Sequence, residues 1–299
     1  IGLDLLFIIV FRWGVAGAAA ATVSAQLIST VACFVYAFVK YPKIRLRPAD
    51  WKIDIGDALL HAEQGIPLGL QFSVLAVGII VMQSVVVKFD ILDGAMVSNA
   101  AQNGFGAANK LHNLLMTPLN GLGSAMTSFT AQNMGADKPE RIKKGTLQAI
   151  GIMAVIAGIS VAGGLLLSIN GTYLRIVLSA DKITKETIRF GNDFLYIDLS
   201  LYVFLGFVFV MRNCVQGIGR PQFILGAGAA ELVGRVVICL ILPALFAGGE
   251  VSAAAPRAAY YALCFADPAA WFAADLVLLV PFVRNIMKMD YGYFYRTKR

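Results

Sequence analysis

One glutamate and one arginine interrupt a long apolar stretch in the last third of the sequence. Glu231 and Arg235 lie four residues apart within residues 223–247, so on a helix they share a face and can form an ion pair. An ionisable side chain at membrane depth costs at least about 2.5–3.5 kcal/mol, which makes each one a candidate for function. Two interpretations stay open: a structural pair that joins helices, or a role in a central cavity and in proton-linked conformational change. Glu231 is the carboxylate that we expect near the middle of the membrane.

Two glutamines lie in another apolar stretch, residues 65–87. Gln71 and Gln83 are twelve residues apart, which on a helix is about 120° off register. At most one of them is therefore expected to face the centre of a cavity. Both are candidates for a substrate or ion pathway, together with Glu231 and Arg235.

The other ionisable side chains are expected to be structural. Asp198 lies near the predicted outer end of its helix, where an exposed cap is expected, and Arg212 lies near an inner end, where it can extend to lipid phosphate or to loop carbonyls. His61 and His112 are far apart and lack the spacing of metal ligands. The four cysteines each lie in an apolar stretch without a C-x-x-C pairing. The sequence predicts no metal, no cofactor and no paired catalytic groups, and hence no enzyme.

The elements that must position these residues are membrane-spanning helices. Of the 299 residues, 58% are hydrophobic and 14% are charged, whereas a soluble domain carries about 25% charge. A span needs about 20 apolar residues. We therefore predict an all-α polytopic fold with one partial span and seven full ones, at residues 1–12, 14–39, 65–87, 103–129, 145–169, 193–215, 223–247 and 259–283.

Lysine and arginine alternate between the connections, and they predict the orientation. The connections after residues 40, 137 and 211, together with the C-terminal tail, hold most of the basic residues, which places them and the C-terminus in the cytoplasm. The same residues lie between apolar runs and not in one stripe with aromatics, which disfavours nucleic-acid binding.

The longest polar connection, residues 41–64, marks the predicted boundary between two halves of the molecule. Residues 1–40 then end a first half, and residues 65–299 form a second half of six complete helices with a cytoplasmic tail. The connection is predicted to be either a solvated linker or an interfacial amphipathic helix. Because the sequence opens with Ile1 inside an apolar run, we expect that it is truncated and that further helices precede it.

Several segments, in order along the chain, resemble the multidrug and toxic compound extrusion (MATE) family. They are Leu3–Ile8 with Trp13–Val23, Gly65–Gln71, Phe129–Ala136 with Arg141–Gly145, Arg212–Gly219, and the series Glu231, Leu232, Arg235, Pro268 and Trp271. The resemblance covers nearly the entire chain, from the fifth helix of the family onward.

The resemblance implies twelve helices in two six-helix lobes around a central cavity. It also implies export of cationic or amphipathic compounds in exchange for Na⁺ or H⁺. The first four helices, one of which carries the acidic coupling residue in many members, have no counterpart here. The seventh helix also lacks the carboxylate that some sodium-coupled members carry, so the choice of coupling ion stays open. The loop with Asn133 and Gly135 is the strongest signature, and we expect it, with Arg212, to hold or gate a cytoplasmic connection.

The function predicted from this resemblance is multidrug efflux by a multi-pass protein of the plasma membrane, monomeric at full length, whose partners are small molecules and membrane lipids. Two alternatives stay open. A lipid-linked saccharide flippase of the same superfamily would need several cationic residues in the cavity, whereas only Arg235 is expected to lie deep. An inactive membrane fragment is the other.

Overall fold

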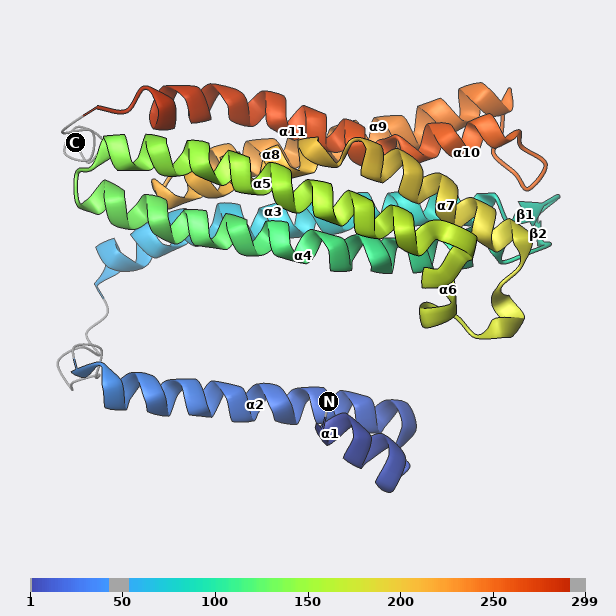
Figure 1. Ribbon diagram of the computed structural model, residues 1–299, viewed down its shortest axis with the longest axis horizontal. Coiled ribbons are helices and arrows are strands. Elements are labelled where there is room, and N and C mark those ends of the chain that lie inside the picture. The colour runs from blue at the N-terminus through green and yellow to red at the C-terminus, as the bar shows by residue number, and fades with distance from the viewer. Residues whose placement is uncertain (1, 43–53, 291–299) are drawn as a thin grey trace. The chain divides into compact units, whose positions relative to one another are not determined.

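The computed structural model describes residues 2–42 and 54–290 (Figure 1). The chain divides into two compact units, Ile1–Leu60 and His61–Arg299, and each is described by itself. The boundary between the units falls within the predicted connection 41–64. The predicted all-α fold is confirmed, and the one sheet of the described residues is a hairpin of two strands with two residues each.

The first unit contains one complete apolar helix. α1 (Gly2–Leu5) runs into a π-helical turn (Leu6–Val10), and α2 (Gly14–Lys40) follows after a sharp reversal. A Cβ atom on Gly17 would lie 2.9 Å from the carbonyl oxygen of Phe7, so the absence of a side chain allows this close return. Only Gly17 and Ala21 of α2 are buried, which leaves an apolar helix surface typical of contact with lipid or with other helices.

The second unit is a helical bundle. Its elements are α3 (Ile55–Lys88), β1 (Ile91–Leu92), β2 (Ala95–Met96), α4 (Ala100–Gly135), α5 (Pro139–Ser168), α6 (Thr172–Val177), α7 (Lys185–Ser200), α8 (Tyr202–Gly217), α9 (Pro221–Ala247), α10 (Arg257–Cys264) and α11 (Ala266–Phe282), with short 3₁₀ turns at Ile169–Gly171 and Ala180–Lys182 and a π turn at Val283–Met287. The first residues of α3 belong to the first unit. α3 begins ten residues before the predicted span at residue 65, so Ile55–Glu63 is helix and continuous with it. Residues 43–53 of the predicted connection lie outside the described residues.

Local sequence signals explain several helix ends. Pro139 and Pro221 begin α5 and α9, where the missing amide N–H of proline costs nothing. Thr184 caps α7 by accepting a hydrogen bond from the amide of Thr187 at 3.1 Å. Gly248 ends α9 with a left-handed φ of 73°.

Five continuous helical stretches of the described residues are long and apolar enough to cross a membrane, and six with the pair α7 and α8, which is bent by 54°. The seven predicted full spans fall on helical segments, and two of them, 193–215 and 259–283, are each made of two helices that meet at Leu201 and at Phe265. The difference from seven arises at α4, which is 36 residues long but carries polar residues such as Asn109, Asn113 and Asn120. These asparagines line a cavity, as described below.

Close packing of α4 against α7 depends on two facing glycines. A Cβ atom on Gly104 would lie 2.5 Å from the carbonyl oxygen of Thr187, and one on Gly191 would lie 2.9 Å from the carbonyl oxygen of Gly104. Small residues let membrane helices approach until their backbones touch. At one end of this bundle lie the connection from α4 to α5 and the end of α11, and at the other end lie the hairpin, α6 and α10 (Figure 1).

Candidate functional site

A cavity of about 370 Å³ opens inside the second unit, among α3, α4, α8, α9 and α11. Its lining includes aromatic side chains from three helices, Phe72, Phe209 and Trp271, and α4 contributes Asn109, His112, Asn113, Met116 and Asn120. Four charged residues also line it: Arg212, Glu231, Arg235 and Asp267. A mostly apolar pocket with a few convergent polar groups is typical of a small-molecule site.

The four charged residues form one chain of alternating sign. Arg212 Nη2 lies 2.7 Å from Glu231 Oε2, and Arg235 Nη2 lies 2.7 Å from Asp267 Oδ1. Arg235 Nε also donates to Asp267 Oδ1 at 2.8 Å, and a longer contact of 3.6 Å joins Arg235 Nη2 to Glu231 Oε1. We call these residues the charge chain. It holds two positive and two negative groups, so its net charge is zero.

The backbone leaves room for these side chains. A Cβ atom on Gly78 of α3 would lie 3.0 Å from Arg235 Nη1, so this glycine accommodates the guanidinium. Asp267 lies in the first turn of α11, where the helix dipole stabilises a carboxylate. α8, α9 and α11 are thereby joined by ion pairs whose side chains are at most 13% exposed.

A second buried pair lies beside the charge chain. His112 Nδ1 is 2.6 Å from Asp198 Oδ2, and Asp198 is fully buried. The imidazole stacks on the indole of Trp271, with ring centroids 5.9 Å apart and planes 11° apart, and the ring of Tyr202 meets it edge-on at 5.8 Å. The pair therefore joins α4 to α7, and its rings extend the contact to α8 and α11.

Four predicted site residues come together at the cavity and one does not. Gln71, Arg212, Glu231 and Arg235 line it, whereas Gln83 is exposed and lies outside its lining. The helical offset between Gln71 and Gln83 accounts for this difference. The expectation that Arg212 reaches lipid phosphate or loop carbonyls is wrong, because its side chain turns inward to Glu231.

The other two predicted site residues lie at the end of α4. Asn133 is buried and its side-chain amide donates to the carbonyl of Phe129 at 2.8 Å, within its own helix. The backbone carbonyl of Asn133 accepts a hydrogen bond from the backbone amide of Lys138 at 2.9 Å, which closes the turn toward α5. Gly135 is the exposed last residue of α4. Neither residue lines the cavity.

Two buried carboxylates, Asp267 and Asp275, are not identified from the sequence, and a third, Asp198, is misplaced. The expected exposed cap at Asp198 is wrong, since this residue is buried against His112, and His112 is more than an isolated structural histidine. Glu231 also shares the apolar interior with Asp267 and Asp275. Neither carboxylate oxygen of Asp275 has a hydrogen-bond partner among the described residues. The signal was available, because Asp275 interrupts the apolar stretch 259–283 as Glu231 interrupts its own.

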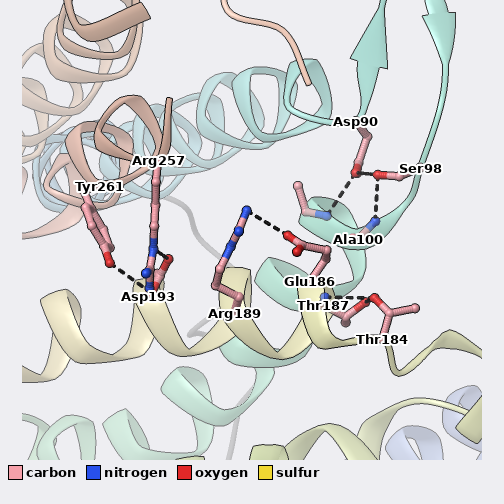
Figure 2. Close-up of polar contacts among 11 residues, drawn as sticks. Asp90, Ser98, Ala100, Thr184, Glu186, Thr187, Arg189, Asp193, Arg257 and Tyr261 are labelled. Carbon is pink, nitrogen blue, oxygen red and sulfur yellow. Dashed lines mark hydrogen bonds and ion pairs between the residues drawn. The ribbon is translucent and has the colours of Figure 1, made fainter. Parts of the chain in front are cut away.

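A separate polar cluster closes the end of the bundle near the hairpin (Figure 2). Asp90 accepts hydrogen bonds from Ser98 and from the amides of Ala101 and Gln102, the last two at 3.0 and 2.9 Å, and so caps α4. Asp193 of α7 accepts two hydrogen bonds from the guanidinium of Arg257, and the Tyr261 hydroxyl lies 3.5 Å from Asp193 Oδ1. These contacts fix α3 to α4 and α7 to α10.

Comparisons with known proteins agree with the fold. The MatE family profile matches residues 78–241. The chain is 30% identical over 221 residues to the probable multidrug resistance protein YpnP of Bacillus subtilis, a match that covers 72% of this chain and 44% of YpnP. It is 26% identical over 203 residues to the probable multidrug resistance protein YoeA of the same organism, covering 65% of this chain and 40% of YoeA.

Solved structures show the same arrangement of helices. A MOP superfamily transporter from Pyrococcus furiosus matches with a TM-score of 0.74 at 19% identity, over 96% of this chain and 60% of that chain. An outward-facing multidrug resistance MATE family transporter of the MOP superfamily matches with a TM-score of 0.73 at 19% identity, over 96% of this chain and 61% of that chain. The matches to YpnP and YoeA cover 44% and 40% of those proteins, so the chain spans less than half the length of the curated relatives that it matches. The family match covers more than half of the chain and includes most of the residues around the cavity, and it confirms the resemblance seen in the sequence motifs: this multi-pass membrane protein belongs to the MatE family.

Proposed function

We propose that this chain supplies the second lobe of a multidrug efflux transporter, and that its cavity binds amphipathic cations. The observation that carries the proposal is the combination of aromatic lining residues with a charge chain of zero net charge. Apolar and aromatic faces hold the body of a varied set of compounds, and an aromatic face also attracts a cation. In this proposal the first unit ends the other lobe, and Na⁺ or H⁺ moves in exchange.

The charge chain disfavours the flippase alternative. Two arginines line the cavity, but each already lies 2.7 Å from a carboxylate. A site for a lipid-linked phosphate would need uncompensated positive charge, as paired guanidinium groups have little potential left for an anion.

The proposed orientation places the connection from α4 to α5 and the end of α11 in the cytoplasm. Lys138, Arg141, Lys143 and Lys144 lie at or beside that connection, and basic residues are retained on the cytoplasmic side. At the opposite end, the polar cluster around Asp193 then faces outward.

The test is efflux of a fluorescent amphipathic cation from cells that express the whole transporter gene, with both lobes, to which this chain contributes the second lobe. We expect efflux that stops when the Na⁺ and H⁺ gradients are collapsed together, and that weakens when Trp271→Ala removes part of the aromatic lining. Collapse of each gradient alone identifies the coupling ion. Efflux equal to that of cells without the gene would contradict the proposal.

A further inference from the structure

The pair His112 and Asp198 connects the cavity to the interior of the bundle. His112 lines the cavity, whereas Asp198 lies behind it and is fully buried. Asp198 Oδ2 is 2.6 Å from His112 Nδ1, and Asp198 Oδ1 has no hydrogen-bond partner among the described residues. A proton that enters from the cavity therefore meets the imidazole first and the carboxyl group next.

The surrounding charges leave Asp198 dependent on His112. Arg235 of α9 and Asp267 of α11 also act on the pair, with opposite sign, and they are bonded to each other. Tyr202 of α8 presents its ring edge to the imidazole. With one shared proton the pair is neutral overall, and without that proton it carries one uncompensated negative charge in a low-dielectric interior. Such a charge is costly unless a cation comes close enough to compensate it.

The pair also lies at the break in a membrane span. Asp198 is three residues before Leu201, where α7 and α8 meet at 54°, and its carbonyl accepts a hydrogen bond from the Leu201 amide at 3.3 Å. Tyr202 begins α8 and contacts the His112 ring. A change in the charge of the pair thus acts on both sides of the bend. Discontinuous helices near the membrane midplane often carry the ion sites of secondary transporters.

We propose that His112 and Asp198 form a one-proton binding site, and that an amphipathic cation in the cavity displaces this proton. Binding of the two cations is then linked, so each weakens the binding of the other by the same factor. The displacement rests on the proposed function, because it concerns the transported compound. The proton site itself does not.

The neighbouring indole provides a direct readout of the proton. The chain has three tryptophans, so Trp13→Phe with Trp51→Phe leaves Trp271 as the single fluorophore. A protonated imidazole stacked on an indole quenches its fluorescence. In detergent or nanodiscs we expect one fluorescence transition as the pH is varied, because histidine is the side chain whose charge most often changes near neutral pH.

Matched variants assign the transition. The chain has two histidines, so His61→Gln is the control and should keep the transition, whereas His112→Gln should abolish it. Asp198→Asn should move the midpoint to lower pH, because a neighbouring carboxylate stabilises the imidazolium. If His112→Gln fails to fold, as judged by thermal unfolding, the Asp198→Asn midpoint decides. A transition that is absent, or unchanged in both variants, overturns the proton site.

Tetraphenylphosphonium, a permanently charged amphipathic cation, tests the displacement. We expect it to lower the midpoint of the Trp271 transition, while the neutral triphenylphosphine oxide leaves the midpoint in place. A midpoint that tetraphenylphosphonium does not move overturns the displacement. If the cells show no efflux but the purified protein shows the fluorescence transition, the result would count against the proposed transport function and not against the proton site.

Discussion

Glu231 lies closer to Arg212 on a neighbouring helix than to Arg235 on its own. The distances are 2.7 Å to Arg212 Nη2 and 3.6 Å to Arg235 Nη2, and Arg235 is in turn 2.7 Å from Asp267. The tight pairs therefore join α8 to α9 and α9 to α11. Glu231 and Arg235, the pair predicted from the sequence, form the longest contact of the charge chain.

This geometry predicts which double variant retains stability. Glu231→Met with Arg212→Met removes one tight pair whole and leaves Arg235 with Asp267. Glu231→Met with Arg235→Met leaves Arg212 and Asp267 as buried charges without their partners, although the formal charge change is the same. Breaking a buried pair costs about 3–5 kcal/mol, whereas replacing both partners with apolar residues is often nearly neutral.

The measurement is thermal unfolding in one detergent for both double variants and for Glu231→Met alone. The first double variant should unfold at a higher temperature than the second. Equal unfolding temperatures would mean that the charge chain is not divided into the two pairs described here.

The helices could be predicted from the sequence, because their length and apolar composition are properties of contiguous residues. Pro139, Pro221 and Gly248 mark helix ends by chemistry that depends on the neighbouring peptide units alone. The six complete spans expected between residues 65 and 283 fall on helical segments of the structure, but the breaks at Leu201 and Phe265 within two of them were not predicted.

The site could be predicted only in part, because its pairs come from distant segments. His112 and Asp198 are 86 residues apart, and Arg235 and Asp267 are 32 apart. Asp198 lies at the end of a predicted span, and from sequence such a position is equally suited to an exposed cap. The bend between α7 and α8 brings that position into the interior. Among the charged pairs of the site, only Glu231 and Arg235, four residues apart on one helix, could be predicted from the sequence.

The facing glycines of α4 and α7 predict a sharp difference between two neighbouring substitutions. Gly104→Ala would place its Cβ atom 2.5 Å from the Thr187 carbonyl oxygen, so the helices must separate. Overpacking of this kind costs about 1–3 kcal/mol. Gly106 is exposed on the same helix with nothing within 4 Å, so Gly106→Ala should be neutral or slightly stabilising. Thermal unfolding of the two variants compares them, and a Gly104→Ala protein as stable as Gly106→Ala would refute the close contact.

The proposed orientation predicts a labelling pattern. After replacement of the four native cysteines, single cysteines at Lys143 and Arg220 should react with an impermeant maleimide only from the cytoplasmic side. Single cysteines at Met96 and Asp181, near the other end of the bundle, should react only from outside. Right-side-out and inside-out vesicles separate the two cases. Labelling of Lys143 and Arg220 from opposite sides would contradict the topology.

Two glutamines on one helix provide the most direct test of the cavity as the transport pathway. Gln71 lies in the cavity wall and is 3% exposed, whereas Gln83 is exposed and outside the lining. Both lie on α3, so Gln71→Leu and Gln83→Leu change the same chemistry at two helical orientations. A hydrogen bond from Gln71 to a bound compound is worth about 1 kcal/mol, and its loss should weaken efflux about fivefold. Gln83→Leu should leave efflux unchanged at equal protein abundance. If Gln83→Leu were the variant that weakens efflux, the pathway would run along the other face of α3, and the cavity described here would not be the substrate site.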